Sequence, residues 1–276
     1  MTSPILHSHS FRNYSLGQFL DYAERGGWTG VELASCHLGE DPAAAVGTVR
    51  TRGLKVETVG FYADVATSRA VDRERATEAL IDLVRLCAEL DVPRLNGFAG
   101  WVLAPDVAWI EWLRHGSRLA SDEQRGWFVD AFTAVSKEAA QRQLTVFVEV
   151  HPNTLHDTTT AAGDLVAMVD STAFGMTLDP GNSTALDPRD ADPKNLVLRG
   201  HPLYFHFKNY QQVGNSATFD VDADKGRLDL RSWLAALPPA TPVCIEYPGD
   251  GDPYPRLDAA RRYYDDIVGG LDRRPV

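Results

Sequence analysis

The chain has 276 residues, of which 24% are charged and 44% are hydrophobic, a composition typical of soluble globular proteins. Its 27 Lys and Arg residues against 38 Asp and Glu residues give a formal net charge of −11, which argues against a large nucleic-acid footprint. Three widely spaced cysteines, no basic-then-apolar leader and no apolar run of ~18 residues predict a cytoplasmic protein without disulfides and without a membrane partner. The sequence is compatible with a monomer and with a homo-oligomer.

Eight short apolar runs predict β-strands, and segments with helical apolar spacing separate them. The predicted strands cover residues 5–8, 30–33, 55–61, 92–98, 144–150, 175–178, 203–207 and 243–245. The predicted helices cover residues 16–25, 42–52, 72–90, 122–142, 161–169, 228–237 and 254–268, with Asp122 as a candidate N-cap. The tryptophan-rich segment 101–119 is interpreted as a loop with a short helix over the site, and the polar segment 211–227 as a long loop.

Eight strands that alternate with helices over about 250 residues predict a (β/α)8 barrel, formed as a single α/β domain over residues 1–276. A doubly wound open sheet is the alternative. It accounts less well for polar strand ends that converge on one place, because only a barrel gathers all strand ends around one mouth. No glycine-rich phosphate-binding motif is present.

The fifth predicted strand ends in polar residues, reading VFVEVHPN. Glu149 and His151 point to the same side, because strand side chains alternate with a period of two. Pro152 cannot donate a strand hydrogen bond, so the strand stops there. A buried carboxylate is costly unless a cation or hydrogen bonds receive it. One strand end therefore presents a carboxylate and an imidazole together.

The next three strands end in the same manner, at Asp179, His206 and Glu246. Together with Glu149, these residues offer three carboxylates and one imidazole for a divalent metal ion. Mn²⁺ and Mg²⁺ are favoured by the oxygen-rich set, and Co²⁺ and Zn²⁺ are also compatible with it. Each residue alone could cap a strand or pair with an arginine, but this is improbable for four in succession.

Other polar residues near the predicted strand ends are candidates for contact with a small oxo-acid or sugar: His7, His9, Arg12, Glu32, Tyr62, Asn182, Lys208, Asn209 and Arg227. His7 and His9 are expected to alternate on one face at the end of the first strand. Arg12 offers a fork for a carboxylate, and Lys208 a partner for a substrate oxygen or enolate. Their alternative roles are ordinary strand-end packing, turn formation and surface charge.

The order Glu149, Asp179, His206, Glu246 at the ends of strands five to eight resembles the xylose isomerase-like barrel superfamily of sugar-phosphate isomerases and epimerases. The resemblance extends over nearly the whole chain. It implies an enzyme that holds one divalent metal ion with these four residues.

A narrower resemblance is carried by SFR at 10–12, FAG at 98–100, EVHPNTL at 149–155 and HFKN at 206–209. These segments look like the bacterial metal-dependent 3-dehydroshikimate dehydratases, in which a histidine commonly takes the position of Asn182. The resemblance implies a lyase that removes a proton next to a carbonyl, with His151 as the base and Lys208 and Tyr62 near the substrate. The alternative is a ketose epimerase, a sugar isomerase or a related oxo-sugar lyase, in which Glu149 or Glu246 would be the base. In that case His151 would only hold Glu149 in place.

Overall fold

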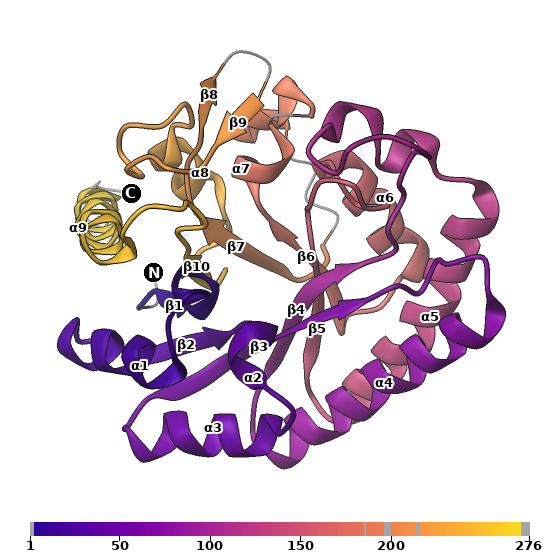
Figure 1. Ribbon diagram of the computed structural model, residues 1–276, viewed down its shortest axis with the longest axis horizontal. Helices are drawn as coiled ribbons and strands as arrows, with labels where there is room; N and C mark the ends of the chain where they lie inside the picture. Colours follow the sequence, from indigo (N-terminus) through magenta and orange to yellow (C-terminus); the bar gives the residue numbers. More distant parts are fainter. Residues whose placement is uncertain (1–2, 185, 196–199, 214–215, 272–276) are drawn as a thin grey trace.

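Eight parallel strands close into a barrel in the computed structural model, which describes residues 3–184, 186–195, 200–213 and 216–271. The order around the barrel is β1-β10-β7-β6-β5-β4-β3-β2 (Figure 1). The strands are β1 Ile5–His7, β2 Gly30–Leu33, β3 Lys55–Ala63, β4 Arg94–Ala99, β5 Thr145–Glu149, β6 Phe174–Leu178, β7 Leu203–Phe207 and β10 Val243–Ile245. The predicted barrel is thus confirmed, and its closure between β1 and β2 and between β1 and β10 excludes an open sheet.

Helices surround the barrel (Figure 1). The α-helices are α1 Leu16–Arg25, α2 Ser35–Leu38, α3 Pro42–Thr51, α4 Ala70–Glu89, α5 Asp122–Gln141, α6 Thr159–Val169, α7 Pro180–Ser183, α8 Leu230–Ala236 and α9 Pro253–Leu271. The 3-10 helices are η1 Ser8–Phe11, η2 Trp112–Arg114, η3 Ser117–Leu119, η4 Pro188–Ala191 and η5 Pro193–Asn195. Within these described residues, no helix is both long enough and apolar enough to span a bilayer.

The start of α5 differs from the expectation by one residue. Ser121, not Asp122, is the N-cap, since its hydroxyl accepts from the backbone N–H of Gln124. The Gln124 side chain in turn accepts from the backbone N–H of Ser121, which completes a capping box. Asp122 lies in the first turn, where its negative charge still favours the helix N-terminus.

The barrel interior below the mouth is filled by a small layer of side chains. Ile5, Phe147, Tyr204 and Cys244 form this layer and come from β1, β5, β7 and β10. All four are buried, as the inward positions of a filled barrel should be. These four side chains fill part of the barrel interior.

Two expectations about strand ends are corrected. β1 stops at His7, and His9 lies in η1 rather than in the strand, because the His7 side chain accepts from the His9 backbone N–H and caps the turn. The expected loop 211–227 contains an antiparallel hairpin of β8 Gln211–Val213 and β9 Ser216–Thr218. β8 is exposed along its length, so no apolar alternation marked it in the sequence.

Candidate active site

The four predicted metal ligands lie together at the carboxyl ends of the adjacent strands β5, β6, β7 and β10. The Nδ1 atom of His206 is 3.5 Å from a Glu149 oxygen, 3.6 Å from an Asp179 oxygen and 3.7 Å from a Glu246 oxygen. That nitrogen is buried and has no hydrogen-bond partner within the described chain. The unpaired nitrogen and the three carboxylates around it together form a ligand set that suits a divalent cation.

The Lys208 ammonium lies among the same carboxylates. Its Nζ is 2.7 Å from Asp179 Oδ2 and 2.7 Å from Glu246 Oε2. Burial alone would lower the pKa of Lys208, but the attraction of Asp179 and Glu246 raises it above its ordinary value. Burial opposes ionisation of Glu246 as well, yet Lys208 holds the pKa of that carboxyl below its usual range. Lys208 is therefore charged and partly neutralises the acidic cluster.

A second network below the cluster orients His206. The other ring nitrogen, Nε2, is 3.5 Å from Glu32 Oε2. Glu32 is also held by Asn96, whose Nδ2 donates over 2.8 Å, and by the Tyr204 hydroxyl, which donates over 2.6 Å. Thr177 donates to Asn96 over 2.6 Å and fixes its amide. A carboxylate behind a ligand histidine fixes the orientation of the ring toward the metal.

Asn96 and Tyr204 were not identified from the sequence, although a signal existed. Tyr204 lies two residues before His206 and therefore on the same face of β7. Asn96 is a polar residue inside an apolar run, as Glu149 is. His156 was also missed. Its Nδ1 lies 2.6 Å from the Glu149 carbonyl oxygen, and its Nε2 lies 2.8 Å from the Ala99 carbonyl oxygen and 3.2 Å from the Ala99 backbone nitrogen. No sequence pattern marks it.

His151 lies beside the cluster, in the wall of the cavity. Its Nδ1 is 2.9 Å from the Pro152 carbonyl, and because a carbonyl can only accept, Nδ1 carries the hydrogen. Nε2 therefore keeps its lone pair. The ring stacks on Phe98, with centroids 4.0 Å apart and planes at 21°. Burial lowers the pKa of His151 to about 4, so its imidazole is neutral at physiological pH.

Asn182 fixes the position of Glu149. Its Nδ2 donates to Glu149 Oε1 and to the Val150 carbonyl, in both cases over 3.0 Å. Its backbone N–H donates to Asp179 Oδ1 at the start of α7. The residue thus joins two of the predicted metal ligands and also lines the cavity.

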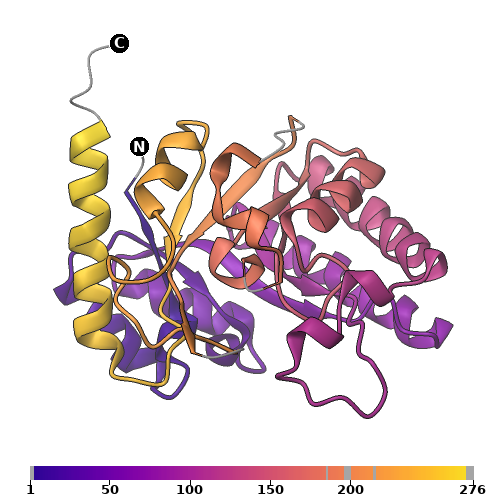
Figure 2. The same cartoon turned by 90° about the horizontal axis from the view of Figure 1, so that it is seen from above.

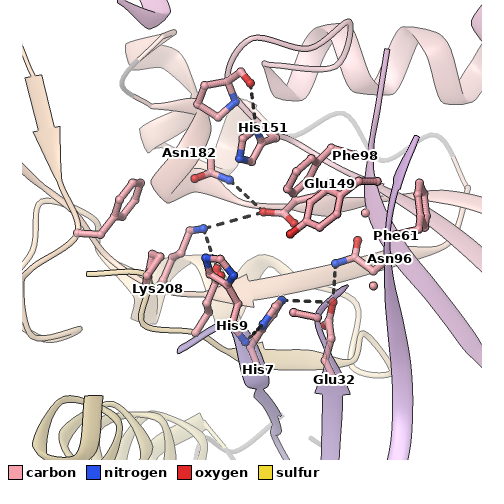
Figure 3. Close-up of a pocket in the computed structure, with 18 of the residues that line it drawn as sticks. His7, His9, Glu32, Phe61, Asn96, Phe98, Glu149, His151, Asn182 and Lys208 are labelled. Carbon is pink, nitrogen blue, oxygen red and sulfur yellow. Dashed lines mark hydrogen bonds and ion pairs between the residues drawn. The ribbon is translucent and has the colours of Figure 1, made fainter. Parts of the chain in front are cut away.

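The cavity above the cluster has a volume of about 390 Å³, and Figure 3 shows Phe61 and Phe98 in its wall. The aromatic side chains that line it are Phe61, Tyr62, Phe98, Trp109, Trp112 and Phe219. Tyr62 is half exposed and packs on Phe98, with ring centroids 4.4 Å apart. Phe219 follows β9, in the segment expected to be a plain loop.

The tryptophan-rich segment after β4 projects from one end of the barrel (Figure 2) and is attached to the segment after β5. Asn153 has a left-handed backbone, with φ of 68°, and its Nδ2 donates to the Trp109 carbonyl over 2.9 Å. Its own carbonyl accepts from the Val102 N–H over 2.8 Å. Trp109 is thereby held at the cavity, which Trp112 also lines, as the sequence predicted for this segment.

His7 and His9 both line the cavity. The Nε2 of His7 is 3.4 Å from Glu32, so His7 belongs to the network behind His206. Burial opposes protonation of His7, but Glu32 outweighs it and raises the pKa of His7. The ring of His9 faces the cavity.

Three predicted substrate contacts lie away from the cavity lining. The Arg12 guanidinium donates to the Gly249 carbonyl over 2.9 Å and to Asp250 over 2.7 Å. The amide of Asn209 donates to the Ala223 and Leu228 carbonyls and accepts from the backbone N–H groups of residues 210 and 228, so all of its hydrogen-bonding capacity is used. Arg227 is exposed, and its side chain lies by the Tyr210 hydroxyl.

The amino-acid sequence matches a known protein family. The model of the xylose isomerase-like TIM barrel family matches residues 20–267. A 3-dehydroshikimate dehydratase from Bacillus anthracis is 25% identical over 222 residues, which are 76% of this chain and 73% of that protein.

Solved structures show the same fold. The probable 3-DHS dehydratase AsbF of Bacillus anthracis, involved in petrobactin synthesis, superposes with a TM-score of 0.71 at 20% identity over 99% of this chain and 100% of that one. An L-ribulose 3-epimerase superposes with a TM-score of 0.76 at 15% identity over 99% and 96% of the two chains. The protein is therefore an enzyme that belongs to the xylose isomerase-like TIM barrel family.

Proposed function

We propose that the protein is a divalent-metal-dependent lyase that removes a proton next to a carbonyl and eliminates water, converting 3-dehydroshikimate to protocatechuate. The observation that carries the proposal is the position of His151, a neutral imidazole whose Nδ1 is committed to Pro152 and whose ring lines the cavity beside Glu149. The 25% identical dehydratase relative supports the choice of substrate.

Each residue of the site has a role in this proposal. Glu149, Asp179, His206 and Glu246 would hold one ion, with Mn²⁺ or Mg²⁺ favoured by the three carboxylates and Co²⁺ or Zn²⁺ also compatible. When bound, the ion supplies Lewis acidity that favours loss of a proton next to a carbonyl. His151 Nε2 accepts that proton, the electrons of the C–H bond form a C=C bond, and hydroxide leaves. Return of the proton from His151 to the hydroxide completes the water. A keto–enol shift, in which the remaining ring CH₂ loses a proton and the carbonyl oxygen gains one, then gives the aromatic diol.

Lys208, Asn182 and Tyr62 assist without taking up the proton. Lys208 brings positive charge to the side of the cavity where an enolate oxygen would lie, beside Glu246. Asn182 keeps Glu149 in place. Tyr62, half exposed at the mouth, would contact the substrate from the solvent side. The aromatic wall excludes water from the reacting carbons.

The test is the formation of protocatechuate from 3-dehydroshikimate by the purified protein with Mn²⁺, followed by absorbance. Changing His151 to Ala should lower turnover by about 10²–10⁴-fold if His151 is the base. His201 lies at the N-terminal end of β7, away from the cavity, so His201→Ala is the matched control and should not change the rate. A His151→Ala enzyme with the wild-type rate would exclude His151 as the base.

A ketose epimerase is the second candidate, and one observation favours it. Glu149 and Glu246 both line the cavity, whereas no arginine is among the described lining residues that could bind a substrate carboxylate. The two carboxylates would then carry the proton from one face of the sugar to the other. Incubation with free ketoses in D₂O distinguishes the two reactions, because only an epimerase incorporates deuterium next to the carbonyl.

A further inference from the structure

His9 faces His151 across the cavity. β1 and β5 are separated by three strands in both directions around the barrel, so they are diametrically opposite. His9 lies in η1, two residues after the end of β1, and His151 lies two residues after the end of β5. Figure 3 shows the two imidazoles on opposite sides of the cavity, with Lys208 and Glu149 between them. A substrate bound at the cluster would therefore present one side to each imidazole.

The ring of His9 lies edge-on to the ring of His7, with centroids 6.1 Å apart, and its nitrogens are available to a ligand. Its backbone N–H donates to His7 Nδ1 over 3.0 Å, which fixes the turn and directs the side chain. The side chain is half-buried, and its ring nitrogens make no hydrogen bond to any described residue. Burial, only partly offset by Glu246, lowers the pKa of His9 to about 4, so the ring is neutral and offers one N–H donor and one lone pair.

The neighbouring polar groups of the cavity are already engaged. The Lys208 ammonium contacts Asp179 and Glu246, and the Asn182 amide donates to Glu149 and a backbone carbonyl. The second ring nitrogen of His7 faces Glu32. Oxo-acids and sugars carry oxygen atoms on several carbons, and an oxygen remote from the cluster needs a donor of its own.

We infer that His9 is a specificity-determining residue that hydrogen-bonds a hydroxyl or carboxylate oxygen of the substrate on the side opposite His151. The inference rests on the proposed function, since it takes the cavity as the substrate site. Sequence reasoning placed His9 near the mouth but on a strand. His9 lies in a 3-10 turn, and its ring lines the cavity. Phe61 and Tyr62 of β3 and Phe98 of β4 form the neighbouring part of the cavity wall.

The test compares wild type, His9→Phe, His9→Gln and the distant control His201→Phe. Each is loaded with Mn²⁺ and assayed for kcat and KM with 3-dehydroshikimate and for deuterium exchange into a free ketose. His9→Phe keeps a planar ring without nitrogens, and we expect kcat/KM to fall about 10-fold or more, mainly through KM. His9→Gln keeps an amide donor and should recover most of this loss. Bound Mn²⁺ and the thermal midpoint should match wild type in both variants.

Three results would overturn the inference while leaving the proposed function intact: a His9→Phe enzyme with kcat/KM within twofold of wild type, a His9→Gln enzyme as impaired as His9→Phe, or loss of bound Mn²⁺ in both variants. The last would show that His9 acts through the metal cluster rather than on the substrate. A wild type that neither releases protocatechuate nor exchanges deuterium rejects the proposed function and this inference together.

Discussion

At the scale of single residues, Lys208 and the acidic cluster compensate each other's charge. Lys208 is buried and contacts two carboxylates at 2.7 Å, with a third, Glu149, 4.0 Å away. Removing one partner of a buried ion pair leaves the other partners without compensation, which is strongly destabilising. A divalent ion binding the same carboxylates would provide that compensation instead.

Lys208→Met should therefore lower the free energy of unfolding of the metal-free protein by about 3–5 kcal/mol, and Mn²⁺ should recover more stability in the variant than in wild type. Urea denaturation in EDTA and in Mn²⁺ measures both effects. Lys225 is exposed and pairs with Asp222, so Lys225→Met is the control and should have little effect. Equal stability of Lys208→Met and wild type in EDTA would contradict the charge-compensation argument.

Glu32 gives a second prediction, on metal affinity. It accepts from Tyr204 and Asn96 and faces His206 Nε2, so Glu32→Gln should disturb the orientation of that ring. We expect Mn²⁺ to bind about 10–100-fold more weakly. Titration calorimetry of the metal-free protein checks this. Glu57→Gln removes a carboxylate of β3 that pairs with Arg94 outside the cavity and should leave the affinity unchanged.

At the scale of elements, the segments after β4 and β5 form one unit over the cavity. Besides the Asn153 side chain, backbone hydrogen bonds join Gly100 to Leu155 and Val102 to Asn153. The Asp157 carboxylate accepts from the Ser117 N–H over 3.0 Å. The tryptophans at the mouth are therefore positioned by the same segment that carries His151.

Two substitutions at Asn153 separate the contribution of its side-chain hydrogen bond from that of its left-handed backbone conformation. Asn153→Gly tolerates the left-handed φ of 68° and removes only the bond to the Trp109 carbonyl. It should speed limited proteolysis within residues 101–119 and leave Mn²⁺ affinity unchanged. Asn153→Ala loses the same bond and also disfavours that backbone by about 1–2 kcal/mol, so it should in addition lower the thermal midpoint. If both variants resist protease as wild type does, the bond does not hold the loop.

The sequence predicted the barrel elements well because each strand is marked by an apolar run and each long helix by its spacing. β2, β7 and β10 have the predicted bounds. The hairpin β8–β9 was not predicted, because the exposed residues Gln211–Val213 carry no inward-facing pattern. Asp122 was a candidate N-cap, but the hydroxyl of Ser121 accepts from the Gln124 N–H instead.

The candidate site also has a part that the sequence predicts and a part that it does not. The convergence of the four candidate metal ligands could be predicted, because each ends a recognisable strand and a barrel brings such ends together. The positions of Arg12, Asn209 and Arg227 could not, because they depend on which neighbours capture each side chain. The contribution of Phe219 depends on a hairpin that local sequence does not mark.

At the scale of the whole molecule, buried neutral histidines link stability to pH. His156 joins β4 to the end of β5, and burial lowers its pKa from 6.5 to about 4. Between these values the unfolded chain binds a proton that the folded chain does not. The free energy of unfolding is therefore unaffected by His156 protonation above pH 6.5. It decreases as the pH falls from 6.5 to about 4, because protonation then favours the unfolded chain.

His156 alone should then account for a loss on the order of 3 kcal/mol between pH 6.5 and 4. Urea midpoints in EDTA over this range should fall more steeply for wild type than for His156→Gln. The variant should be less stable at pH 7, since it loses contacts to both strands. Parallel curves for the two proteins would mean that His156 is protonated in the folded state as well.

The order of strands around the barrel has a consequence for how this protein can change over generations. The predicted metal ligands occupy the contiguous arc β5-β6-β7-β10, whereas His9, Tyr62, Phe98 and the tryptophans belong to the arc β1 to β4 and the segment that follows it. On the proposed function, mutation of these cavity-lining residues of the second arc would change substrate preference and leave the predicted ligands of the first arc in place. A library confined to His9, Tyr62, Phe98 and the tryptophans should thus yield new specificities in variants that still bind the ion, whereas a library at the four predicted ligands should yield mainly inactive variants.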